Sequence, residues 1–153
     1  MAIETVLVVI GDEDERRAET LARVAAEEAV PSDAQVVVGY AFTEEGFGDA
    51  VQRFGFDRSA DQLSPGDVAD RVASVQAAHS YLDDEGVETS VHAAIGETGP
   101  ETFVKMSADL EADRVVVGGD RRSPAGKAVF GSDAQTILLD ADCPVVYVGG
   151  DVE

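Results

Sequence analysis

Short, unbroken apolar runs recur along the chain and alternate with segments of helical spacing, which restricts it to few architectures. Four of these runs are rich in β-branched residues: 6–10, 36–38, 115–117 and 145–148. Such runs are typical of strands that are covered on both faces, as in a parallel sheet. A fifth strand is expected over 87–95, where every second residue from Val87 to Ala93 falls on one face.

The segments between these runs carry signals of helix starts and stops. Three pairs of residues have the i, i+3 spacing of a capping box or its Asp variant: Asp12 and Glu15, Thr98 and Glu101, Ser132 and Gln135. A further helix is expected over 67–85, where apolar residues form one stripe and Gly86 ends it. The chain therefore alternates strands and helices along most of its length.

This alternation predicts an α/β fold with a parallel sheet and right-handed crossovers, built in three α/β/α layers. With 153 residues, the chain is expected to form a single domain over 1–153.

The segment 43–66 does not follow the alternation of strands and helices, because it has four glycines and no sustained hydrophobic period. We expect a long loop or a mobile lid there. Its Phe47, Phe54 and Phe56 either cover a site or, as we favour, pin the loop to the body.

Negative charge dominates the composition. Asp and Glu total 31 against 11 Lys and Arg, which gives a net charge of -20. Such a field repels polyanions, so we expect no nucleic-acid partner and no anionic membrane partner. Lys105 and Lys127 are the only lysines. High salt screens self-repulsion, because the Debye length falls to about 3 Å at 1 M. We therefore expect a halophilic protein from a saline cytosol.

The sequence carries no signal of membrane insertion, secretion or metal binding. No apolar run approaches the roughly 20 residues that cross a bilayer, and no basic flank precedes the run at 6–10. The lone Cys143 can form no intramolecular disulfide, and we interpret it as a small buried thiol in a reducing, cytoplasmic compartment. His79 and His92 are interpreted as structural, and no catalytic residue is predicted because no base and nucleophile pair can be assembled.

Ligands of open α/β sheets bind beyond the carboxyl ends of the strands, which selects the loops after Ile10, Ala41 and Val117. The third loop is basic and ends in Gly131 and Ser132 at a helix start. Backbone N–H groups, the helix dipole and a hydroxyl can together hold a phosphate there. The alternative, that Ser132 is only a helix cap and the cations form surface ion pairs, stays open.

The charge of this loop contrasts with the rest of the chain. Arg121, Arg122 and Lys127 face a single acid, Asp120, so the loop is locally positive inside a strongly acidic chain. The nucleotide-site residues that we predict lie in this loop and at two other strand ends: Gly118, Gly119, Arg121, Arg122, Gly131, Ser132, Gly11, Asp12 and Tyr40.

Other nucleotide motifs fail on inspection. Arg121 stands where a P-loop has its first glycine, and Ala128 where it has Ser or Thr. No G-x-G-x-x-G follows the first strand, so a dinucleotide site is not expected. Asp12 is a candidate for binding magnesium, and the alternative is a solvated helix start favoured by the dipole.

The spacing of the basic loop resembles the G-x2-G-x9-G-[ST] motif of the universal stress protein family. Gly118, Gly131 and Ser132 match it in register, Arg121 replaces its second glycine, and Gly11 replaces the aspartate that ends the first strand in ATP-binding members. The resemblance covers nearly the whole chain and is to an acidic member of the haloarchaeal kind.

The resemblance implies a flavodoxin-like, five-stranded sheet of order 3-2-1-4-5. It implies binding of ATP or another adenine nucleotide, with or without magnesium, and places Tyr40 beside the adenine. It also implies a homodimer formed through the edge strand 144–148. No enzymatic reaction is predicted, although slow ATP hydrolysis accompanies binding in some relatives.

Two alternatives to nucleotide sensing stay open. In the first, the chain is a dimeric interaction protein in which Arg121 fills the pocket and no nucleotide binds. In the second, Asp12 and magnesium serve a small phosphoryl-transfer or nucleotidyl-transfer enzyme.

Overall fold

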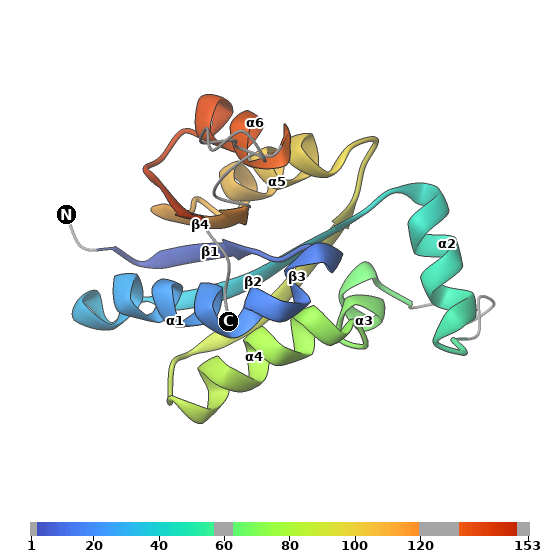
Figure 1. Ribbon diagram of the computed structural model, residues 1–153, viewed down its shortest axis with the longest axis horizontal. Helices are drawn as coiled ribbons and strands as arrows, with labels where there is room; N and C mark the ends of the chain where they lie inside the picture. The colour runs from blue at the N-terminus through green and yellow to red at the C-terminus, as the bar shows by residue number, and fades with distance from the viewer. Residues whose placement is uncertain (1–2, 57–62, 120–131, 150–153) are drawn as a thin grey trace, which may run out of the picture.

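The computed structural model describes residues 3–56, 63–119 and 132–149, except for the side chains of residues 12, 13, 132 and 133. In this part of the chain, five strands form one parallel sheet of order β3-β2-β1-β4-β5 (Figure 1). The strands are β1 (Thr5–Val9), β2 (Gln35–Phe42), β3 (Thr89–Ile95), β4 (Arg114–Gly119) and β5 (Val145–Gly149). The predicted parallel sheet and its strand order are confirmed.

Helices cover both faces of the sheet, as predicted for three layers. α1 and α4 lie on one face, and α5 and α6 lie on the other (Figure 1). The α-helices are α1 (Ala18–Ala29), α2 (Glu44–Arg53), α3 (Pro65–Ala69), α4 (Ala73–Asp84), α5 (Gly99–Asp109) and α6 (Ser132–Asp140). Two short 3-10 helices, η1 (Asp12–Arg17) and η2 (Val30–Ser32), flank α1. None of the described helices is long and apolar enough to span a membrane.

The core is built on the two sides of the central strand β1. Val6, Val8 and Ile10 pack with the α1 and α4 layer, whereas Leu7 and Val9 pack with the α5 and α6 layer. This division follows from the alternation of side chains along a strand. The unbroken apolar runs are therefore explained by burial on both faces, and the edge strand β5 is the exception because it is only partly buried.

The prediction of a long loop or lid over 43–66 is wrong for the described part of that segment. α2 begins after Thr43, whose Oγ1 accepts a hydrogen bond of 3.0 Å from the Gly46 N–H. A short helix, α3, follows later in the segment. Phe47, Phe54 and Phe56 pack against the core on the α1 and α4 side, as the favoured interpretation stated.

The single helix predicted over 67–85 is in fact divided into α3 and α4. α3 begins at Pro65, within a capping box formed by Ser64 and Asp67. A turn follows α3, in which the Val72 N–H donates to the Ala69 carbonyl oxygen, and Val72 then adopts an extended conformation as the N-cap of α4. The apolar stripe nevertheless continues across the break, because its members are all buried: Val68, Val72, Val75 and Leu82. The periodicity therefore identified the buried face correctly but did not reveal the interruption.

Of the other predicted caps, the one at Thr98 agrees with the structure, because Thr98 Oγ1 accepts from the Glu101 N–H at 3.4 Å. α6 begins at Ser132, but the Ser132 side chain lies outside the described residues, so its cap with Gln135 stays a prediction. The predicted cap of Asp12 with Glu15 is wrong, because Gly11 takes the cap position and Asp14 Oδ2 accepts its N–H at 2.8 Å. Asp14 is nearly buried, and its carboxylate, at the third helical position, points back toward the end of β1 and accepts the N–H group of the cap residue.

Asp113 fastens β4 to the beginning of β1. Its Oδ2 accepts hydrogen bonds from the N–H groups of Glu4 and Thr5, at 2.8 and 3.1 Å. These two bonds hold the pKa of the Asp113 carboxyl below its usual value. Because folding lowers this pKa, the carboxylate stabilises the fold at neutral pH, and that contribution is lost as the pH falls through the lowered pKa.

Candidate functional site

The order of the strands reverses between β1 and β4: β2 and β3 are added on one side of β1, and β4 and β5 on the other. β1 pairs with β2 on one side and with β4 on the other, so successive crossovers leave this point in opposite directions. Open α/β sheets bind ligands at such a switch point. The structure brings three of the predicted site residues to the carboxyl edge of the sheet at this point: Gly11 after β1, and Gly118 and Gly119 at the end of β4.

Gly118 allows the beginning of α1 to approach β4 closely. A Cβ atom added to Gly118 would lie 3.0 Å from Leu21 Cδ2 and 3.1 Å from Arg17 Cδ. Contacts this short require the neighbours to shift, so a larger residue would displace Arg17 or Leu21. The glycine therefore serves the packing of this edge in addition to any role toward an anion.

Arg17 is a cation at the switch point that the sequence analysis missed. Its Nε lies 2.8 Å from Asp14 Oδ1, and the two side chains are only 13% and 7% exposed. Asp14 in turn accepts the Gly11 N–H, so one carboxylate joins the end of β1 to the arginine beside β4. The i, i+3 spacing of Asp14 and Arg17 could have indicated this ion pair, but neighbouring acids lie at similar spacings from arginines and made the signal ambiguous.

Gly119 makes room for an aromatic side chain of β5. A Cβ atom added to Gly119 would lie 2.6 Å from Tyr147 Oη, closer than unstrained contacts allow. The end of β4 is therefore packed against the edge strand β5. Both glycines at the end of β4 have a packing reason that is independent of a ligand.

Tyr40 lies in the core, with an exposed fraction of 5%. Its ring packs edge-on against Phe42 at a centroid distance of 4.8 Å, on the α1 and α4 side of the sheet. A ring that is buried in this way offers little surface to an adenine in this conformation. Its place beside the adenine stays a prediction.

The remaining predicted site residues lie outside the described residues. Arg121, Arg122 and Gly131 belong to the segment 120–131, and the side chains of Asp12 and Ser132 are likewise outside the description. Among the described residues, no group of three or more His, Cys, Asp or Glu side chains is placed to hold a metal ion. The phosphate loop and the magnesium candidate therefore stay predictions.

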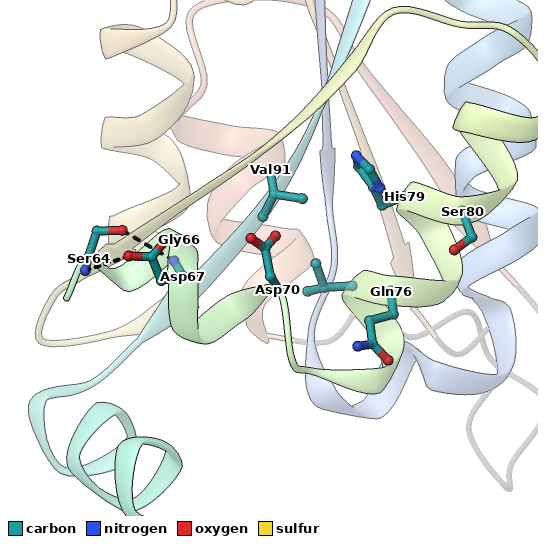
Figure 2. A pocket seen from close by; sticks show the side chains of 9 residues that line it. Ser64, Gly66, Asp67, Asp70, Gln76, His79, Ser80 and Val91 are labelled. Atoms are coloured by element: carbon teal, nitrogen blue, oxygen red, sulfur yellow. Dashed lines mark hydrogen bonds between the residues drawn. The ribbon is translucent and has the colours of Figure 1, made fainter. Parts of the chain in front are cut away.

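A hollow of about 670 Å³ lies beside the outer strand β3, between α3, α4 and β3, and includes no residue of β1 or β4 in its lining. Figure 2 shows Asp67, Asp70 and His79 among the side chains around it, with Val91 of β3. Asp67 is held by its reciprocal hydrogen bonds with Ser64. Two carboxylates disfavour a phosphate by like-charge repulsion, so this hollow does not suit a nucleotide.

Cys143 is half-buried before β5. Burial raises the pKa of its thiol, and the positive charge of Arg114 opposes this only in part. The thiol is therefore protonated at neutral pH and weakly nucleophilic. The interpretation of Cys143 as an unreactive thiol agrees with this pKa, although the side chain is less buried than expected.

The parallel sheet of order 3-2-1-4-5 and the switch point between β1 and β4 define a Rossmann-like α/β protein, a class whose ligands bind at the carboxyl edge of the sheet. The family model described as "Universal stress protein family" matches residues 2–149. The chain belongs to the universal stress protein family.

Individual relatives support this assignment. A universal stress protein of Mycolicibacterium smegmatis is 31% identical over 78 residues, which cover 51% of this chain and 60% of that protein. A universal stress protein structure from Archaeoglobus fulgidus is 26% identical with a TM-score of 0.67, covering 96% of this chain and 98% of the other. A universal stress protein from the same organism, solved in complex with dAMP, is 22% identical with a TM-score of 0.63 and the same coverages.

Proposed function

We propose that this protein is a stress-response module that binds ATP or a related adenine nucleotide at the loop between β4 and α6. One observation carries the proposal. The family motif begins at Gly118 on the carboxyl edge and ends at Ser132, where α6 begins, so it joins a strand end to a helix N-terminus. This is the arrangement in which backbone N–H groups and the helix dipole favour phosphate. The dAMP complex of the A. fulgidus relative supports an adenine nucleotide as the ligand.

We assign the predicted residues to two parts of this site. Arg121 and Arg122 supply forked donors to phosphate oxygens, which offsets the loss of the motif's second glycine. Asp12 is the candidate that would hold a magnesium ion beside the phosphates. Its carboxylate suits the oxygen-ligand preference of that ion.

Calorimetric titration of the full chain with ATP and magnesium in molar potassium chloride tests this site. We expect the double variant Gly131→Ala, Ser132→Ala to bind at least about tenfold more weakly, because it loses close backbone approach and a hydroxyl donor. A matched control is Gly66→Ala, Ser80→Ala, since a Cβ atom at Gly66 would meet only ordinary contacts and Ser80 is exposed. Absence of both heat and thermal shift in the unmodified protein would contradict the proposal.

We further propose a homodimer formed through the edge strand at 144–148. β5 lies at the end of the sheet, and Val145, Val146 and Val148 are only partly buried in the single chain. An apolar edge with free pairing groups favours association with a second copy. We expect sedimentation at micromolar concentration to give a dimer, and Val146→Lys to shift it toward monomer. A stable monomer of the unmodified chain would overturn this assembly.

We propose that the protein works in a saline cytosol. Its net charge of -20 penalises the compact state at low ionic strength. We expect the melting temperature to rise from dilute buffer to molar potassium chloride, because the Debye length falls to about 3 Å at 1 M. Scanning calorimetry across a potassium chloride series measures this, and higher stability in dilute buffer would count against it.

A further inference from the structure

We propose that the N-terminus of α4 forms a second anion site, which takes the phosphate group of inorganic phosphate or of a small phosphate monoester. A cavity of about 290 Å³ lies there, lined by η1, the end of α2, the turn before α4 and the first residues of α4. The residues that give it its chemistry are Arg53, Arg71, Ser74 and Glu15. The site does not depend on nucleotide binding at the β4–α6 loop.

The helix supplies the first element of the site. α4 is 12 residues long, and its cap residue Val72 has no side chain that could accept the first N–H groups. The N–H groups of Ala73, Ser74 and Val75 therefore have no acceptor within the helix. The positive end of the helix dipole lies at the same place and favours an anion.

Two arginines supply the second element. Arg53 Cζ lies 4.6 Å from the ring centroid of Phe54, and Arg71 Cζ lies 5.1 Å from that of Phe56. Within the described part of the chain, neither guanidinium has a carboxylate at ion-pair distance. Stacking on an aromatic ring restricts a guanidinium without using its N–H donors. Both arginines are thus held beside the cavity with donors to spare.

Ser74 provides the independent observation that points to a ligand. Ser74 is one of the residues that line the cavity and is 1% exposed, yet its Oγ has no hydrogen-bond partner among the residues that the structure describes. Buried hydroxyl groups are almost always hydrogen-bonded, because an unsatisfied one is unfavourable. As the second residue of α4, Ser74 can donate to the same anion that the helix N–H groups bind. An occupied site would therefore satisfy a hydroxyl group that the described part of the chain leaves without a hydrogen-bond partner.

The donors favour phosphate over carboxylate. Two guanidinium forks, a hydroxyl and a helix N-terminus approach from different elements, and a tetrahedral oxyanion can accept from all of them. A planar carboxylate has only two oxygens and would leave some donors unused. Glu15 opposes the anion, but the two arginines leave the lining positive by one charge. α4, whose first residues line the cavity, lies on the same face of the sheet as α1, whereas α6 lies on the other face (Figure 1).

Titration of the full chain with inorganic phosphate in chloride buffer, followed by glycerol 2-phosphate, tests the site. We expect Arg53→Gln and Arg71→Gln each to raise the Kd by about tenfold or more, since each removes charge-assisted donors. Arg23→Gln on α1 is the matched control, because it removes the same charge from an exposed position. Glu15→Gln should lower the Kd. Binding of neither probe, or equal weakening by Arg23→Gln, would overturn the proposal.

Two further measurements separate a real site from a structural role. Without phosphate, Ser74→Ala should melt higher than the unmodified protein, because it removes an unsatisfied hydroxyl, and phosphate should then stabilise it less. A lower melting temperature of Ser74→Ala without phosphate would contradict this reading. The variant Gly131→Ala, Ser132→Ala should keep its phosphate affinity, and loss of it would show that phosphate binds at the nucleotide loop instead.

Discussion

Leu7→Ala is expected to lower the free energy of unfolding by about 3–4 kcal/mol, the usual cost of a Leu-to-Ala cavity in a core. Leu7 is fully buried on the central strand β1 and packs in the cluster formed with α5 and α6. Its Cδ1 would lie 2.7 Å from a Cβ atom added to Gly39, so the neighbouring strand has no side chain that could move in to fill the space. Urea unfolding followed by circular dichroism measures the change.

Leu139→Ala is the control for this prediction. Leu139 lies on α6 with an exposed fraction of 75%, so the same chemical change creates no cavity. We expect its effect to stay within about 0.5 kcal/mol, as for surface substitutions in general. Similar losses in the two variants would show that β1 is not the centre of the core.

Asp14→Ala is expected to lower the free energy of unfolding by about 2–4 kcal/mol, because it removes a nearly buried carboxylate that serves two partners. The variant leaves the Gly11 N–H without its acceptor and Arg17 without this carboxylate. Asp14→Asn keeps an acceptor for Gly11 but loses the charge, so its loss of stability should be intermediate. Denaturant unfolding at neutral pH gives all three values.

Glu27→Ala is the matched control for the ion pair. Glu27 pairs with Arg23 at 3.4 Å on the exposed face of α1, where both side chains are more than half exposed. Exposed pairs of this spacing contribute about 0.3–0.5 kcal/mol. If Asp14→Ala cost no more than Glu27→Ala, the switch point would not be held by the Asp14 and Arg17 pair.

The sheet could be predicted from the sequence because burial on both faces leaves a strong signal. Apolar runs such as 6–10 and 115–117 are not interrupted by polar residues, so they are easily recognised as buried strands. The motif that begins at Gly118 indicated the family, and the family implied the strand order. The helix α2 was missed for the opposite reason. Gly46 and Gly48 interrupt the helical spacing of its apolar residues, so Thr43 was not recognised as the N-cap of a helix that buries Ala50 and Val51.

The candidate site was only partly predictable. Motif spacing predicted Gly118 and Ser132 as site residues, and the structure places them in β4 and at the beginning of α6. Arg17 was missed because its importance depends on the approach of α1 to β4, which no local pattern records. The α4 cavity was missed because Arg53 and Ser74 come together only through the packing of α2, α3 and α4.

The position of β1 also determines when the molecule can fold. Thr5 bonds with Asp113, which lies 108 residues later in the chain, and Val6 pairs with both Val36 and Arg114. A ribosome therefore releases β1 and β2 long before β4 exists. Until then, one edge of the most apolar strand stays open to other chains, and closing so long a loop is slow. Pairing of β4 with β1 is thus the step that covers this edge, and it can follow only after β4 has left the ribosome.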